Sequence, residues 1–199
     1  MKSVLHVGCG SATIANMPAG FQNGGWRELR FDIDPAYSVD FVGTMLDMKV
    51  VADDSVDALY SSHNIEHVDA HQVDVVLREF RRVIKPDGFV VVTCPDLEAV
   101  AKHIAEGRLE DPLYTSPSGP ISALDILYGH GAAIARGEVY MAHRTGFTAK
   151  TLAAHAQAAG FVTLGVRRRP KHHDLWMIGT KQSASGDQIG ELLASYARA

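Results

Sequence analysis

A glycine-rich turn and an aspartate near the N-terminus could together bind a nucleoside. Gly8, Cys9 and Gly10 follow a short β-favouring run, and a turn rich in glycine lets backbone amides approach a ligand closely because glycine has no Cβ. Asp32 lies at the end of the next such run. A carboxylate in that place accepts hydrogen bonds from both hydroxyls of a ribose. The pair therefore predicts an adenosine site, whereas the glycine turn alone fits a plain tight connection equally well.

Histidines form a second group of candidates. The segment from His63 to His67 has the spacing H-x-x-E-H, which in zinc peptidases supplies two metal ligands and a glutamate base. We reject that reading and predict no metal, because a zinc site needs a further ligand at a suitable place. Glu66 and His67 are expected to support a crevice wall through hydrogen bonds. For His63 a catalytic and a structural role remain about equally favoured.

Four residues between positions 128 and 144 suggest a substrate pocket. His143 has the chemistry of a base and Arg144 that of an anion-binding group, although a turn that docks this segment on a core explains both residues as well. His130 and the nearby Tyr128 leave the same two readings open. We take Tyr128, His130 and Arg144 as candidate substrate-binding residues.

The candidates in the first half of the chain stand where β-strands are expected to end. Residues rich in β-branched and aromatic types predict strands over 4–7, 28–33, 56–60 and 89–93. From Val73 the apolar residues recur at helical spacing until a turn at 85–88. Strands that alternate with crossovers predict an α/β fold with a mostly parallel sheet, whose carboxyl edge lines one crevice.

The second half begins with an irregular stretch. A helix is expected over 97–106, but 107–144 is rich in proline and glycine and holds only short helical segments such as 122–128. We interpret 97–147 as an insertion that forms a lid over the crevice. A helix from Thr148 to Gly160 and a hairpin of strands 162–168 and 175–180, with the last strand antiparallel, then complete a single domain over 1–199, and 182–199 forms a tail.

Composition excludes several classes of protein. The 199 residues carry 19 Lys and Arg against 23 Asp and Glu, a net charge of −4 that argues against general nucleic-acid binding. Because apolar runs are too short to span a membrane and the first residues lead directly into a strand, a cytoplasmic protein without membrane contact is expected. The two cysteines are expected to be reduced thiols.

Four segments, 5–10, 31–35, 55–67 and 77–88, follow one another in a characteristic order. Together they resemble the successive motifs of class I S-adenosylmethionine-dependent methyltransferases, in particular the small type 11-like members. The resemblance covers about residues 3–96, and the last helix and strand pair fit that family's closing unit. It implies a Rossmann-like sheet and S-adenosylmethionine as the cofactor.

The resemblance also implies roles for individual residues. The glycine turn would contact the methionine part of the cofactor, Asp32 its ribose and Ile33 its adenine. Asp47, followed by Met48, would bind the adenine amino group, and Ser62 and His63 would lie near the sulfonium methyl group. The chain departs from the pattern in two places, where Ala12 replaces a third glycine and where 11–26 is too short and broken for a regular helix.

These observations lead to an expected function. The protein is predicted to move a methyl group to a small-molecule or saccharide acceptor by in-line displacement, with His63 and His143 as candidate bases. A methyltransferase fold that only binds a partner is the alternative. An NAD-dependent enzyme is disfavoured because Thr13 stands where a third glycine is needed. The sequence defines neither the accepting atom nor the oligomeric state.

Overall fold

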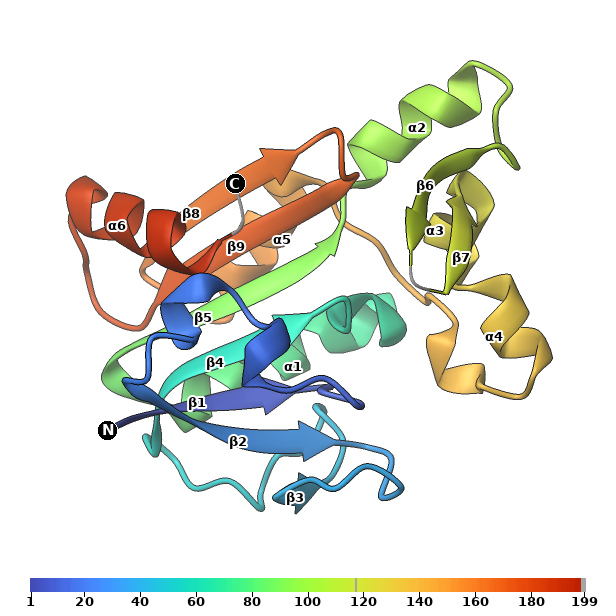
Figure 1. The fold of residues 1–199 in the computed structure, drawn as a ribbon. Coiled ribbons are helices and arrows are strands. Elements are labelled where there is room, and N and C mark those ends of the chain that lie inside the picture. The colour runs from blue at the N-terminus through green and yellow to red at the C-terminus, as the bar shows by residue number, and fades with distance from the viewer. Residues whose placement is uncertain (117, 198–199) are drawn as a thin grey trace.

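A seven-stranded sheet forms the body of the molecule (Figure 1). The computed structural model describes residues 1–116 and 118–197, so Pro117 of the expected lid and residues 198–199 of the expected tail lie outside the described part. The strands lie in the order β3-β2-β1-β4-β5-β9-β8. They are β1 (Lys2–Val7), β2 (Trp26–Asp32), β3 (Phe41–Val42), β4 (Val56–Ser62), β5 (Ile84–Pro95), β8 (Thr163–Arg169) and β9 (Asp174–Thr180).

The direction of the strands confirms the predicted fold class. The pairs among β1, β2, β3, β4 and β5 are parallel, while β9 runs antiparallel to both β5 and β8. From β1 the chain adds β2 and β3 on one side, and it then returns to add β4 on the other side of β1. Open α/β sheets bind ligands at such a switch point. The predicted hairpin at the end of the chain is also present, since β8 and β9 pair from Arg169 and Asp174 outward.

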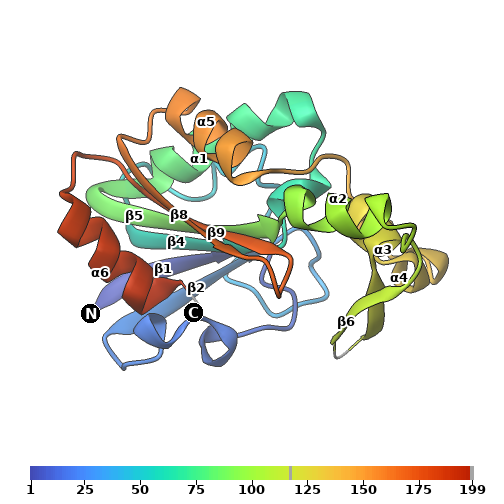
Figure 2. The same cartoon turned by 90° about the horizontal axis from the view of Figure 1, so that it is seen from above.

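Helices cover both faces of the sheet (Figure 2). On one face lie α1 (Val73–Val83) and α5 (Ala149–Ala158), and on the other lies α6 (Gly186–Tyr196). The apolar stripe of α1 is buried against the sheet as its spacing predicts, with Leu77 and Phe80 fully enclosed. Thr148 caps α5 by accepting a hydrogen bond from the Thr151 amide, and Gly160, with φ of +96°, follows its end.

The crossover between β1 and β2 contains no regular α-helix, as predicted. It forms two 3₁₀ turns, Ile14–Asn16 and Ala19–Phe21. Helix α6 packs beside them, and the ring of Tyr196 lies 4.6 Å from that of Phe21, centroid to centroid. The C-terminal helix therefore helps to cover the sheet face that the short crossover leaves open.

One predicted boundary is wrong. The turn expected at Lys85–Gly88 is part of β5, which begins directly after α1. Its pairing with β4 shifts there, because Val56 pairs with Ile84 while Ala58 already pairs with Phe89. Residues 85–88 therefore form an irregular bulge in β5. Their turn-forming types are accommodated within the strand instead of preceding it.

The insertion is a small subdomain beside the carboxyl edge of the sheet (Figure 1). It contains α2 (Leu97–Ala105), β6 (Pro112–Ser116), β7 (Gly119–Ser122), α3 (Ala123–Tyr128), α4 (Gly131–Ala135) and a 3₁₀ turn at Val139–Met141. The α3 segment was predicted, whereas the β6–β7 hairpin was not. Val100, Ile121 and Ile126 form part of a separate apolar cluster inside it. Within the described residues, no helix of the molecule is long and apolar enough to cross a membrane.

Candidate functional site

The glycine turn and Asp32 meet at the carboxyl edge of the sheet, as the sequence predicts. Val7 pairs with both Phe31 and Ser61, so β1, β2 and β4 end side by side. Gly8 and Gly10 have φ of +66° and +51°, a region that suits glycine. A Cβ at Gly8 would lie 1.9 Å from the Asn64 side-chain nitrogen. The turn therefore requires glycine for its own conformation and for its contact with the end of β4.

Asp32 holds this turn in place through its carboxylate. The residue is 7% exposed, and its Oδ2 accepts a hydrogen bond from the Gly10 amide at 2.7 Å while Oδ1 accepts one from the Asp34 amide at 2.9 Å. Arg30 donates to the Gly10 carbonyl at 2.6 Å. Since each carboxylate oxygen has two acceptor positions, both oxygens of Asp32 can accept a further hydroxyl. Ile33 is 47% exposed and offers an apolar surface next to it.

The end of β4 provides a second polar edge. The Ser62 and Thr93 hydroxyls are hydrogen-bonded at 2.8 Å, and the His63 amide donates to the Thr93 carbonyl at 2.9 Å. His63 adopts φ of +50°, which is uncommon for a residue with a side chain. Both cysteines are buried free thiols, as predicted, and burial raises the pKa of Cys9, which lies in the glycine turn.

Asp47 and Met48, the predicted adenine-binding pair, have partners of their own in the structure. The Met48 side chain is fully buried in the main core, its amide donates to Glu79, and its carbonyl accepts from Arg82. The Asp47 carboxylate pairs with Lys49 at 2.9 Å and lines a hollow of about 620 Å³ against α1. The Met48 side chain is therefore enclosed by the core, while the Asp47 carboxylate is half exposed.

The sequence reading overlooked two residues on this edge because it did not predict β3. Val42, the last residue of β3, pairs with Asp32, and the Gly43 amide donates to the Asp32 carbonyl at 2.9 Å. Thr44 and Met45 follow directly and therefore stand closer in sequence to the ribose candidate than Asp47 does. Recognising these residues would have required locating the end of β3, and a strand of two residues is too short to be recognised from the periodicity of the sequence.

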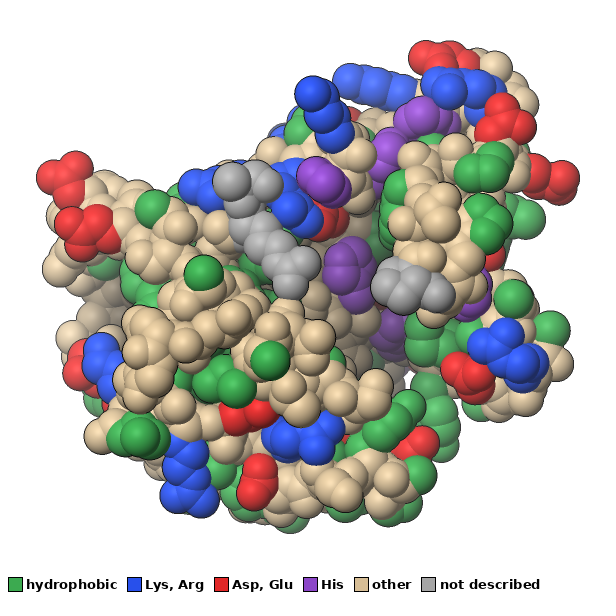
Figure 3. All heavy atoms as spheres, in the orientation of Figure 1, with side chains coloured by type: hydrophobic (Ala, Val, Ile, Leu, Met, Phe, Trp, Pro, Cys, Tyr) green, Lys and Arg blue, Asp and Glu red, His purple; other side chains and the backbone are tan. Residues whose placement is uncertain are grey.

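A cluster of histidines and a glutamate lies where the insertion meets the core. One candidate ligand atom from each of Glu66, His67 and His143 lies within 4.8 Å of the other two. Glu66 and His67 belong to a 3₁₀ turn that follows β4, while His143 comes from the end of the insertion. Figure 3 shows histidine side chains gathered in the hollow between the body and the insertion.

The two imidazoles of the cluster are oriented by backbone carbonyls. His67 Nδ1 lies 3.0 Å from the Ala142 carbonyl, and His143 Nδ1 lies 2.7 Å from the Ile126 carbonyl. A carbonyl oxygen only accepts, so both Nδ1 atoms donate, and the Nε2 atoms take no part in these two hydrogen bonds. Burial lowers the pKa of His143, which favours its neutral form.

The Glu66 carboxylate is buried beside them. It is 1% exposed, and within the described residues neither of its side-chain oxygens accepts a hydrogen bond. Burial alone would raise the pKa of Glu66, but His63, 3.5 Å away, and the two other imidazoles outweigh it and lower the pKa. The His63 side chain is 46% exposed; partial loss of its hydration beside the protein opposes its charge, yet Glu66 raises the pKa of His63 overall. The pocket therefore holds a negative charge surrounded by imidazoles.

The remaining candidates frame the same junction. The Arg144 amide donates to the Glu66 carbonyl at 2.8 Å, and its guanidinium lies 3.6 Å from Asp69. The Tyr128 carbonyl accepts from the His143 amide at 3.1 Å, while the Tyr128 side chain is 66% exposed. His130 stands directly before α4, and its side chain makes no capping hydrogen bond. The structure thus brings His143 and Arg144 to Glu66 and leaves the Tyr128 ring at the surface.

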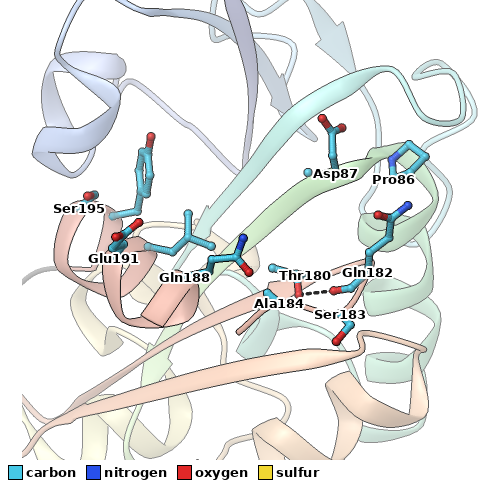
Figure 4. A pocket seen from close by; sticks show the side chains of 12 residues that line it. Pro86, Asp87, Thr180, Gln182, Ser183, Ala184, Gln188, Glu191 and Ser195 are labelled. Atoms are coloured by element: carbon cyan, nitrogen blue, oxygen red, sulfur yellow. Dashed lines mark hydrogen bonds between the residues drawn. The ribbon is translucent and has the colours of Figure 1, made fainter. Parts of the chain in front are cut away.

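A further hollow lies at the opposite edge of the sheet. It measures about 470 Å³ and lies between the bulge of β5, the end of β9 and helix α6 (Figure 4). The Thr180 hydroxyl on its wall is bonded to the Gln182 carbonyl at 2.7 Å. Thr180 pairs with Phe89, which in turn pairs with Ala58 near the start of β4. The hollow therefore lies at the amino ends of the parallel strands, away from their carboxyl ends.

Comparison with known proteins agrees with this geometry. Residues 5–92 match the family model described as a methyltransferase domain. No curated protein sequence matches the chain. Among solved structures, a protein from Pyrococcus horikoshii superposes with a TM-score of 0.59 at 14% identity, covering 91% of this chain and 82% of that one.

Two further solved structures carry methyltransferase names. A methyltransferase from Thermotoga maritima, described as a possible histamine N-methyltransferase, has a TM-score of 0.58 at 15% identity and covers 92% of this chain and 83% of its own. The 1,6-didemethyltoxoflavin-N1-methyltransferase of Burkholderia thailandensis was solved with bound 1,6-didemethyltoxoflavin and S-adenosylhomocysteine. It has a TM-score of 0.56 at 18% identity, and the match covers 92% of this chain and 72% of that one. At these identities the structures share the fold. Residues 5–92 thus match a methyltransferase-domain family model, and the chain as a whole shares the fold of these solved structures.

Proposed function

We propose that the protein transfers a methyl group from S-adenosylmethionine to a small-molecule acceptor, with the cofactor bound across the ends of β1 and β2. The observation that carries this proposal is the joint placement of Asp32 and the glycine turn. Asp32 already binds the Gly10 amide at 2.7 Å and keeps acceptor positions for the ribose hydroxyls. The exposed side chain of Ile33 fits the adenine, as the resemblance implies.

The residues present fit this cofactor. Gly10 has no Cβ, and one built there would meet only the Tyr37 ring at 3.9 Å, so its backbone is open to the methionine part. For adenine recognition we propose Thr44 and Met45 in addition to Asp47, since they follow β3 directly. When bound, S-adenosylmethionine supplies a methyl group on a positively charged sulfur, which is a good leaving group.

The chain's own residues would then align the acceptor. A lone pair of the acceptor forms the new bond to the methyl carbon, the electrons of the carbon–sulfur bond stay on sulfur, and the acceptor loses a proton if the attacking atom carries one. Ser62 and His63, at the end of β4, stand near this reaction, and His63 and His143 are the candidate proton acceptors. Most of the acceleration comes from position and exclusion of water.

The insertion is proposed to cap the acceptor. Its cluster of Val100, Ile121 and Ile126 makes it a packed unit, and Arg144 brings a cationic group to the junction, while Tyr128 and His130 would offer an aromatic and an imidazole group from the insertion. Such groups suit a polar or anionic small molecule, and a saccharide is one class that fits. The toxoflavin-precursor methyltransferase, which shares the fold, also acts on a small molecule.

The test is calorimetric titration with S-adenosylmethionine and S-adenosylhomocysteine, with NAD as a ligand that should not bind. Asp32→Ala removes two charge-assisted hydrogen bonds and is expected to weaken binding roughly 30- to 150-fold. Asp87→Ala is the matched control, because Asp87 is an exposed aspartate at the opposite edge of the sheet. Thermal unfolding of each variant confirms that the fold persists. Equal binding by wild type and Asp32→Ala, or preference for NAD, would overturn the proposal.

A further inference from the structure

We propose that Glu66, His67 and His143 form a binding site for a divalent first-row transition-metal ion of the Zn²⁺ type. The three residues come from two separate parts of the chain, the turn after β4 and the end of the insertion. One ligand atom from each lies within 4.8 Å of the others. Zinc ligands at about 2.1 Å from the ion stand roughly 3.4 Å apart, so small side-chain rotations close the site.

The imidazoles are prepared for coordination. His67 and His143 each use Nδ1 to donate to a backbone carbonyl, at 3.0 and 2.7 Å. Histidines that bind metals generally donate the other ring nitrogen to a carbonyl or carboxylate, which fixes the tautomer and the ring orientation. The Nε2 lone pairs of both rings are therefore the ones available to an ion.

The carboxylate supplies the second, independent observation. Glu66 is 1% exposed, and within the described residues both its oxygens lack a hydrogen-bond donor. A buried carboxylate without partners is costly, and native proteins explain such groups by an ion, a water or a functional role. His63 Nδ1, at 3.5 Å from one oxygen, is too distant for a good hydrogen bond. A bound cation would neutralise the charge and satisfy the oxygens.

This site differs from the peptidase-type H-x-x-E-H arrangement that the sequence suggests. That arrangement places both histidines on adjacent turns of one helix, whereas His63 precedes a 3₁₀ turn and has φ of +50°. The ligand that the sequence did not reveal is His143, which the fold brings to Glu66 and His67. Two imidazoles and one carboxylate suit zinc, cobalt, nickel, iron or manganese better than magnesium or calcium.

The role of the ion rests on the proposed methyl transfer. Three protein ligands leave at least one coordination position open, and the site begins four residues after the end of β4, beside the expected position of the acceptor. An acceptor oxygen bound there would be held in place and made more acidic. His143 would then act as a ligand, and His63 would be the proton acceptor that remains.

Metal binding is testable without any activity. Protein treated with a chelator is titrated with Co²⁺ and Zn²⁺, with Mg²⁺ as a comparison, by calorimetry and by the visible absorption of protein-bound Co²⁺. One equivalent of Co²⁺ or Zn²⁺ is expected to bind, and Mg²⁺ is expected to bind much more weakly. Glu66→Gln, which preserves size, and His143→Ala are each expected to weaken Co²⁺ binding by at least about tenfold. His172→Ala, at an exposed histidine in the turn between β8 and β9, should bind Co²⁺ as the wild type does.

The outcomes separate this proposal from the proposed function. Wild-type protein that binds S-adenosylmethionine but no Co²⁺ or Zn²⁺ overturns the metal site alone. Stoichiometric Co²⁺ binding without cofactor binding supports the site and overturns methyl transfer. Unchanged Co²⁺ binding by Glu66→Gln also overturns the metal site, and this variant decides the matter if His143→Ala fails to dock its insertion.

Discussion

The body of the sheet and the insertion are built by different means. In residues 1–96, functional groups stand at the ends of strands whose register is fixed by neighbours on both sides, as for Gly8 and Asp32. In the insertion, the candidate His143 is brought to the core by the docking of the whole segment. The docking contacts include the hydrogen bonds from Leu97 to the Phe147 carbonyl and from Arg144 to the Glu66 carbonyl.

This difference bears on how the two candidate sites behave. A strand end moves only if the sheet moves, so the cofactor candidates share the stability of the main core. The histidine cluster depends on docking of a subdomain with a small apolar cluster, which can open locally at lower cost than global unfolding. We therefore expect the cofactor site to be rigid and the site at Glu66 to depend on insertion docking.

The largest effect is expected from Phe80→Ala. Phe80 is fully buried between α1 and the sheet, and its removal should lower the free energy of unfolding by about 4 kcal/mol. Urea denaturation measures this, and Arg78→Ala on the exposed side of the same helix should change it by less than about 0.5 kcal/mol. Similar losses for both variants would contradict the assignment of the main core.

A smaller and local effect is expected from Ile126→Ala. Ile126 is 6% exposed in the insertion's cluster, and its truncation should cost about 2 to 3 kcal/mol of local stability. Hydrogen exchange should become faster in 97–146 while the amides of β1 and β4 stay protected. If protection of the central strands fell in parallel, the two regions would unfold as one unit and the contrast between them would fail.

The smallest effect is expected from Arg144→Ala. The Arg144–Asp69 pair spans 3.6 Å and both side chains are about half exposed, so its loss should cost less than about 0.5 kcal/mol. Docking of the insertion, measured by proteolysis within 128–145, should be unchanged because the Arg144 amide still donates to the Glu66 carbonyl. Rapid cleavage of this variant would show that the ion pair holds the insertion.

Prediction from the sequence succeeded where the determinants are local. Glycine at a left-handed turn, an acid at a strand end and the 3.6-residue stripe of α1 each leave a short signature, and the structure places Gly10, Asp32 and Phe80 accordingly. It was less accurate at Lys85–Gly88, where turn residues form a bulge, and at β3, which is too short to show a period. Asp47 and Met48 were chosen without knowledge of that strand.

The sequence by itself determined most strands of the sheet, the helices α1 and α5, and a glycine turn followed by an acid at the next strand end, because each leaves a pattern in residues close together along the chain. Only the tertiary structure decided that α6 packs beside the short crossover and that His143 joins Glu66 and His67. Those contacts join segments far apart in sequence, and their geometry depends on how whole elements dock. A local sequence pattern does not indicate how the elements dock, so the neighbours of His143 could be identified only in the folded protein.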